Sequence, residues 1–95
     1  MRIPKQVKLL GLTYDVSILA PKDWTYSDTE ECVGVFIPHL RKICLLYNPD
    51  KPALEHTYLH ELVHAILHCM GRDELYKDEA FVDLFAGLLH QSLTG

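Results

Sequence analysis

Residues 50–71 of this 95-residue chain read DKPALEHTYLHELVHAILHCMG, the most informative stretch of the sequence. It predicts one long helix that ends near Met70. Asp50 is a good N-cap, Pro52 falls in the first turn, where its missing N–H does no harm, and Gly71 suits the position just past the end. Apolar residues at i, i+3, i+4 and i+7 spacing predict the core face of this helix: Leu59, Leu62, Val63, Ile66 and Met70.

A polar stripe lies beside this apolar face and includes Thr57, His60, His64 and His68. His60 and His64 are four residues apart, so on a helix both imidazoles face one point in space. Neutral imidazole is a favoured zinc ligand. Glu61 is rotated by roughly 100° from His60, too far to be a third ligand, but it could reach a metal-bound water as a general base. The alternative interpretation is two histidines that form ordinary hydrogen bonds in the core.

The first half of the chain, residues 1–48, is rich in β-branched and aromatic residues and predicts strands. We expect four strands, the last two as an antiparallel hairpin, at residues 7–10, 13–19, 33–37 and 42–47. Residues 20–31 contain Pro21 and several turn formers, and they are expected to form a loop or a short helical turn.

A second helix is predicted at residues 77–92, after a short connection that would place the two helices side by side. Its apolar positions are Val82, Phe85, Ala86, Leu88 and Leu89. Together these elements predict a single α+β domain over residues 1–95. We expect a small antiparallel sheet of three or four strands, packed on the histidine-bearing helix and on the second, C-terminal helix.

Composition and charge argue against several classes of protein. The net charge of −4, without a basic cluster, argues against nucleic-acid binding. No apolar run approaches the roughly 20 residues that cross a bilayer, and the N-terminus lacks the apolar stretch of a signal peptide. An odd number of cysteines and no CxxC motif argue against a disulfide framework and a cysteine zinc site. We therefore expect a cytoplasmic protein in which Cys32, Cys44 and Cys69 are small core residues.

Four residues are candidates for a third metal ligand: His68, Asp78, Glu79 and His90. His68 lies one turn further along the same helix, and one straight helix cannot easily wrap three consecutive turns around one tetrahedral ion. Glu79 is favoured because it forms an ExxxD spacing with Asp83 on one face of the next helix. Glu79 would complete a two-histidine, one-glutamate set, while Asp83 accepts the second ring N–H of a ligand histidine. The alternative is that both carboxylates lie on a solvated face.

The two predicted helices resemble those of a known group of enzymes. The sequence HELVH, with Glu79 and Asp83 on the next helix, resembles the gluzincin metallopeptidases, which include thermolysin. More closely, it resembles the ImmA/IrrE-type peptidases and the minigluzincins, over about residues 33–92. Asp83 stands where that family usually has Asn, and the family's helix-turn-helix partners have no counterpart in this chain. The resemblance implies Glu61 as the catalytic base and zinc bound by His60, His64 and Glu79.

The resulting hypothesis is a zinc-dependent metalloendopeptidase that hydrolyses protein or peptide substrates. Because an edge strand binds extended substrate in gluzincins, the substrate is expected on residues 33–37 or 42–47. Tyr76, between the two helices, is a candidate second donor to the oxyanion; the alternative is a core aromatic residue with a satisfied hydroxyl. Two other hypotheses remain, a non-catalytic zinc-binding domain that acts as a protein-interaction module and a metal-free domain with a fortuitous motif.

Overall fold

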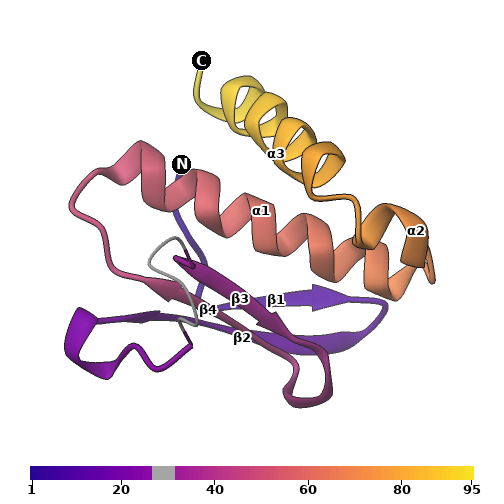
Figure 1. Ribbon diagram of the computed structural model, residues 1–95, viewed down its shortest axis with the longest axis horizontal. Coiled ribbons are helices and arrows are strands. Elements are labelled where there is room, and N and C mark those ends of the chain that lie inside the picture. The colour runs from indigo at the N-terminus through magenta and orange to yellow at the C-terminus, as the bar shows by residue number, and fades with distance from the viewer. Residues whose placement is uncertain (27–31) are drawn as a thin grey trace.

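Four strands form one sheet in the computed structural model, which describes residues 1–26 and 32–95. Their order in the sheet is β1-β2-β4-β3 (Figure 1). The strands are β1 (Gln6–Leu9), β2 (Leu12–Leu19), β3 (Gly34–Ile37) and β4 (Lys42–Leu46). The loop expected at 20–31 contains a short 3-10 helix, η1 (Pro21–Asp23). The part of that prediction that falls on residues 27–31 lies outside the described residues.

The sheet is mostly antiparallel and contains one parallel pair, β2 with β4. After β2 the chain passes to the edge of the sheet, forms β3 and returns through η2 (Pro38–Leu40) as β4, between β2 and β3. The predicted hairpin of the last two strands and the α+β class are confirmed. β4 is one of the two inner strands and the more buried of them, since three consecutive side chains are at most 3% exposed: Ile43, Cys44 and Leu45.

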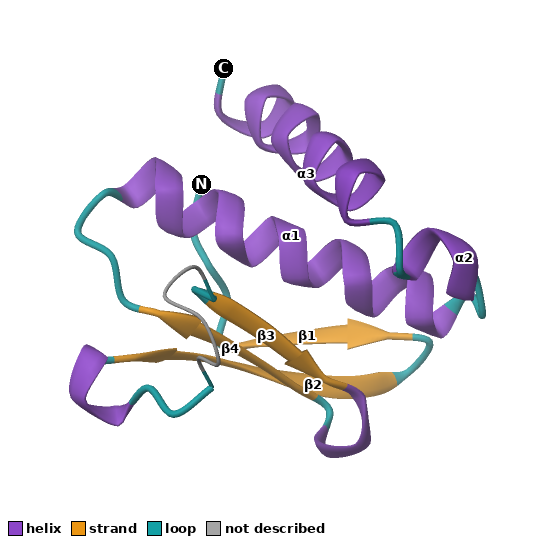
Figure 2. Ribbon diagram, in the orientation of Figure 1, coloured by secondary structure: helices purple, strands orange, loops and turns teal. Residues whose placement is uncertain are grey.

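Helix α1 (Lys51–Cys69) begins and ends where the sequence predicts. Asp50 caps its start by accepting a hydrogen bond from the N–H of Ala53 (3.2 Å), and Gly71 has a φ of 69° just past its end. α1 covers one face of the sheet, and α3 (Glu79–Thr94) packs on the opposite side of α1 (Figures 1 and 2). α1 is therefore the middle layer between the sheet and α3.

The middle position of α1 decides which of its residues are buried. Leu59 and Val63 belong to the core as predicted, and Leu62 and Ile66 are half-buried. Met70 is 63% exposed, so its place in the predicted core face is wrong; it is the C-cap, beyond the last covered turn. Because α1 is covered on two sides, further buried side chains come from around the helix: Leu54, Tyr58, Ala65 and Leu67.

The connection between the long helices contains a one-turn helix, α2 (Asp73–Tyr76). α3 then begins at Glu79, two residues later than predicted. Asp78 is its N-cap and accepts a hydrogen bond from the N–H of Phe81 (3.0 Å). This cap fixes the first turn of α3, from which the Glu79 side chain extends.

Only a narrow face of α3 is buried. Val82 and Ala86 are fully buried in the core that α1 contributes to, and Leu89 packs against its edge, as predicted. Phe85 and Leu88, which the sequence gives as apolar positions of this helix, are 50% and 58% exposed. The reason is that α3 packs mainly on α1, which separates it from the sheet. Only the side of α3 that faces α1 is therefore buried.

Two expectations from composition concern the cysteines and the membrane. All three cysteines are free. Cys44 is buried as predicted, whereas Cys32 and Cys69 are only half-buried, so the prediction that each is a core residue is wrong for these two. Cys69 lies where α1 leaves the core, with its Sγ 3.3 Å from the hydroxyl of Tyr14. In the part of the chain that the structure describes, every helix is too short or too polar to cross a membrane.

Candidate metal centre

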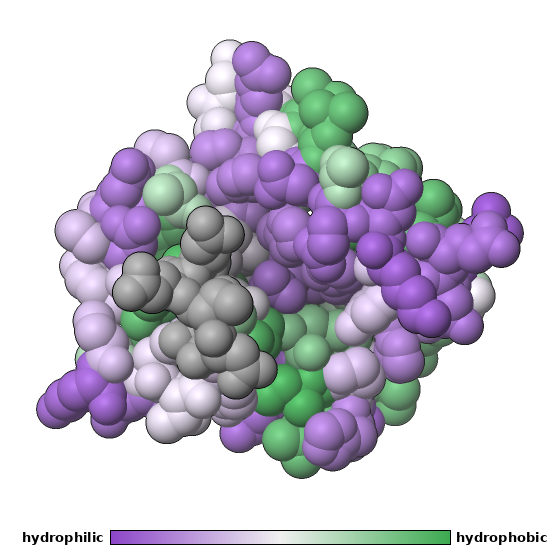
Figure 3. Space-filling model, viewed as in Figure 1, coloured by the Kyte–Doolittle hydropathy of each residue, from purple (hydrophilic) through white to green (hydrophobic). Residues whose placement is uncertain are grey.

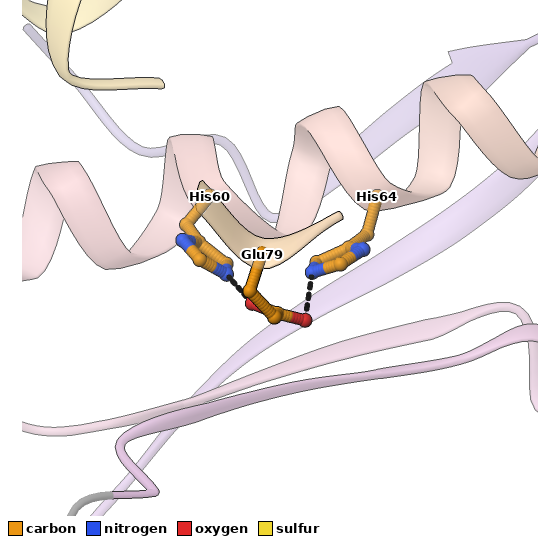
Figure 4. Close-up of side chains that lie close together, drawn as sticks. All are labelled: His60, His64 and Glu79. Carbon is orange, nitrogen blue, oxygen red and sulfur yellow. Dashed lines mark hydrogen bonds and ion pairs between the residues drawn. The ribbon is translucent and has the colours of Figure 1, made fainter. Parts of the chain in front are cut away.

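The packing of α3 on α1 brings His60, His64 and Glu79 together. Their ligand atoms all lie within 4.8 Å of one another, close enough to bind one metal ion. Nε2 of His60 lies 3.0 Å from Oε2 of Glu79, and Nε2 of His64 lies 3.1 Å from Oε1. Figure 4 shows the carboxylate facing both imidazoles, with one oxygen toward each ring. In a tetrahedral site with bonds of about 2.0–2.1 Å, neighbouring donors lie about 3.3 Å apart, so this donor set fits a divalent cation.

Asp83 lies one turn after Glu79, and its carboxylate is hydrogen-bonded to His60. Its Oδ1 is 3.2 Å from Nδ1 of His60, the position predicted for a carboxylate that accepts the second ring N–H. In the tautomer with the proton on Nδ1, His60 donates to Asp83 and keeps the lone pair of Nε2 for a metal. The same Oδ1 lies 3.4 Å from Nε2 of His56, so one carboxylate contacts two histidines of α1.

His64 is the more deeply buried of the two ligand candidates, at 6% exposed. Burial lowers the pKa of its imidazole, an effect that outweighs the attraction of the Glu79 charge. The neutral ring that results is the form that binds a metal ion. Nδ1 of His64 is buried and has no hydrogen-bond partner among the described residues. The ring of Tyr76 packs edge-on against the imidazole, with ring centroids 4.8 Å apart.

Glu61 is a carboxylate with an unusual environment, 8% exposed and beside the two histidines. Burial raises its pKa to about 7, and the negative charge of Glu79 adds to this effect, while His60 opposes it. A carboxylate poised near neutral pH is suited to accept and to return a proton. Glu61 lines the same cleft as His60 and His64.

The residues of this centre line an open cleft of about 450 Å³. α1 and α3 form two of its walls, and β3 together with the preceding Cys32 and Val33 forms the third. Figure 3 shows hydrophilic residues gathered in the middle of this face of the molecule, between α3 and β3. No Lys or Arg is among the described residues that line the cleft, so carboxylates and imidazoles determine its charge.

The other three candidate ligands lie elsewhere. Asp78 caps α3, and His90 pairs with Glu55, with its Nε2 2.8 Å from Oε1 of that residue. His68 is exposed and packs edge-on against Phe36, with ring centroids 5.7 Å apart. Each of these residues therefore has a structural contact of its own, and the structure brings together only Glu79 with the two histidines.

Sequence reasoning gave no role to His56, which lines the cleft, and did not single out Gly34 within the strand expected at residues 33–37. His56 stands four residues before His60 on the same stripe of α1, so the spacing that selected His60 and His64 could have found it. Gly34 gave no such signal, because its place against α1 follows from the packing of β3 on the helix, which is not local in sequence.

Replacing Asp83 by Ala is expected to weaken metal affinity roughly 10–100-fold without abolishing it, because His60 loses the acceptor that orients its ring. The measurement is a competition titration of the purified protein against a metal-binding dye. Glu74→Ala removes an exposed carboxylate outside the cleft and is the matched control. Equal affinities in Asp83→Ala and wild type would show that the contact with His60 does not support the site.

The donor set, the buried carboxylate and the open cleft are thus the observations that bear on function. The chain matches no known protein-family model, no curated protein and no solved structure.

Proposed function

We propose that this chain is a zinc-dependent endopeptidase, with His60, His64 and Glu79 as the zinc ligands and Glu61 as the general base. The observation that carries the proposal is the buried Glu61 carboxylate beside a three-residue donor set in an open cleft. Structural zinc sites usually have four protein ligands, whereas catalytic sites keep one position open. A purely structural metal also needs no proton acceptor beside it.

The chemistry divides between the metal and Glu61. A zinc ion in this donor set would polarise the peptide carbonyl and lower the pKa of water toward 7. Glu61 then accepts a proton from the water that attacks the carbonyl and delivers it to the leaving amine. Glu61 is buried in the same cleft as the three donor residues, so one carboxylate is placed for both transfers.

The strand order favours one of the two strands expected to bind substrate. β4 lies between β2 and β3, so both of its edges are already paired. β3 is the last strand of the sheet, and Gly34 at its start lines the cleft next to Glu61. An extended peptide added to the edge of β3 would therefore pass along the cleft with its backbone held by main-chain hydrogen bonds.

Tyr76 is our candidate for a second donor to the oxyanion. Its ring lies against the ring of His64. Burial raises the pKa of its hydroxyl, and the negative charges of Glu61 and Glu79 raise it further, although Tyr76 is not among the described residues that line the cleft. A protonated phenol in that place can donate a hydrogen bond to a developing negative charge.

A second candidate function is a zinc-binding domain that binds a partner protein without catalysis. The observation in its favour is the outer face of α3, where three apolar side chains are 50% to 66% exposed: Leu84, Phe85 and Leu88. Exposed apolar surface of this kind is common at interaction sites. It does not account for a buried proton acceptor in the cleft, which is why we favour the peptidase.

The proposal is tested by metal analysis and hydrolysis on the same preparation. We expect one zinc per chain by elemental analysis of protein purified without added metal. Cleavage of an unfolded protein should stop on chelation and return when zinc is restored. Absence of metal contradicts the proposal, and zinc with no cleavage of a broad peptide library favours the binding domain instead.

In metal-free protein, Glu61→Gln is expected to be more stable than wild type above pH 7 but not at pH 4. Burial raises the folded-state pKa from 4.5 to about 7, so the stability due to protonated Glu61 is present below pH 4.5 and lost as the pH rises through 7. This rise in the pKa of Glu61 corresponds to about 3 kcal/mol in the free energy of unfolding. Urea unfolding of both proteins from pH 4 to 8 measures it; a constant difference across this range would contradict the buried carboxyl.

A further inference from the structure

Gly34, the first residue of β3, is glycine for reasons of space. Its φ lies outside the left-handed region, so its backbone conformation is open to any residue. A Cβ at this position, however, would lie 2.7 Å from Cγ2 of Thr57, 3.1 Å from Cγ of Glu61 and 3.2 Å from Oε2 of Glu61. The strand thus touches the helix at the residue that we propose as the base.

None of the groups in this contact can easily move away. The hydroxyl of Thr57 donates to the carbonyl of Ala53 at 3.0 Å, which fixes the direction of its methyl group. Glu61 is buried at 8% exposed. On the other side, β3 is paired with β4, whose three middle residues are buried, and the carbonyl of Val33 accepts from the N–H of Leu46 at 2.9 Å. The backbone at Gly34 is therefore one wall of the space that holds the Glu61 carboxylate.

We propose that Gly34 is a positioning residue. Because it has no side chain, the edge strand β3 packs directly against Glu61 and keeps the Glu61 carboxylate beside the metal ligands. The inference rests on the proposed function. A side chain at this position displaces either the carboxylate or the strand. A displacement of about 1 Å in a reacting group can lower a rate by about 10²-fold.

The test uses two substitutions together, because the new Cβ of Gly34→Ala alone would lie too close to two side chains, Thr57 and Glu61. Thr57→Ser removes the methyl group that lies 2.7 Å from the new Cβ and retains the hydroxyl that bonds Ala53. In Gly34→Ala/Thr57→Ser the remaining tight contacts are those to Glu61. Thr57→Ser is the reference for this variant. Gly87→Ala is the matched control, since among the described residues outside its own helix backbone a Cβ there meets only His56 Nε2, at an ordinary 3.7 Å.

We expect Gly34→Ala/Thr57→Ser to bind zinc as Thr57→Ser does and to lose about 10²-fold in kcat, with KM little changed. Gly87→Ala should keep the wild-type kcat. In a Glu61→Gln background the same pair of substitutions should have no further effect on kcat, because residues that act as a unit are non-additive. A double variant as active as Thr57→Ser, or a loss that adds fully to that of Glu61→Gln, would overturn the proposal.

A readout without hydrolysis separates this proposal from the proposed function. The ¹³C NMR signal of the Glu61 carboxyl in zinc-loaded protein should change its position and its pH profile in Gly34→Ala/Thr57→Ser, and not in Gly87→Ala. If wild type cleaves nothing, a displaced Glu61 signal still supports the contact and an unchanged signal overturns it. If the double variant does not fold, Glu61→Ala is added: a regained fold supports the contact, and a chain that stays unfolded overturns it.

Discussion

Glu61→Gln is expected to lower peptide hydrolysis by about 10²–10⁴-fold while zinc stays bound. Gln has nearly the same shape as Glu but cannot accept a proton, and Glu61 is not among the three residues whose ligand atoms converge. The loss should therefore appear in kcat, with the metal content of the variant equal to that of wild type. The measurement is cleavage of an unfolded protein or a peptide library, with the two proteins at equal zinc occupancy.

Glu74→Gln provides the control for this experiment, because Glu74 is an exposed carboxylate on α2 that does not line the cleft. It should leave the cleavage rate unchanged. If a confirmed substrate is cut equally well by wild type and Glu61→Gln, Glu61 is not the base and the mechanism is wrong. If neither protein cuts any substrate while both bind zinc and a common partner, the non-catalytic interpretation replaces the peptidase.

Glu79→Ala is expected to abolish zinc binding at the metal concentrations that saturate wild type, because it removes one of three donors. Zinc present at 100–1,000 times its dissociation constant stabilises a folded protein by about 3–4 kcal/mol. For a domain of this size that corresponds to a melting temperature about 10–20 °C higher. Chelation should therefore lower the melting temperature of wild type by this amount and leave that of Glu79→Ala unchanged.

Elemental analysis and thermal unfolding with and without chelator measure both effects. Glu74→Ala again serves as the control and should respond to chelation as wild type does. Glu79→Ala that retains one zinc per chain would exclude Glu79 as a ligand. Wild type that contains no transition metal, and whose melting temperature does not respond to added zinc, would exclude the metal centre altogether.

The features that the sequence predicts best are those fixed by local geometry. The cap at Asp50, the end of α1 near Gly71 and the shared face of His60 and His64 follow from the helical repeat alone. The convergence of Glu79 on these histidines was predicted from a resemblance and a spacing, and the packing of α3 on α1 places it there.

The features that were missed depend on contacts between distant segments. Alternation along the strands does not give their order, so the parallel pairing of β2 with β4 was not predicted. The apolar pattern of α3 did not indicate that Phe85 and Leu88 would remain exposed, because that depends on how few elements cover α3. For Gly34 the sequence offers only a glycine near a strand, and its contact with Glu61 exists only in the folded packing.

The placement of the donors on two helices has a consequence for the topology of the chain. A metal bound by His64 and Glu79 closes a loop of 15 residues (79 − 64) that contains α2. It would act as a reversible cross-link, and a covalent link across a loop of that length removes about 3 kcal/mol of chain entropy from the unfolded state. α3 has only Val82 and Ala86 fully buried, so such a link would matter more to its attachment than to the sheet.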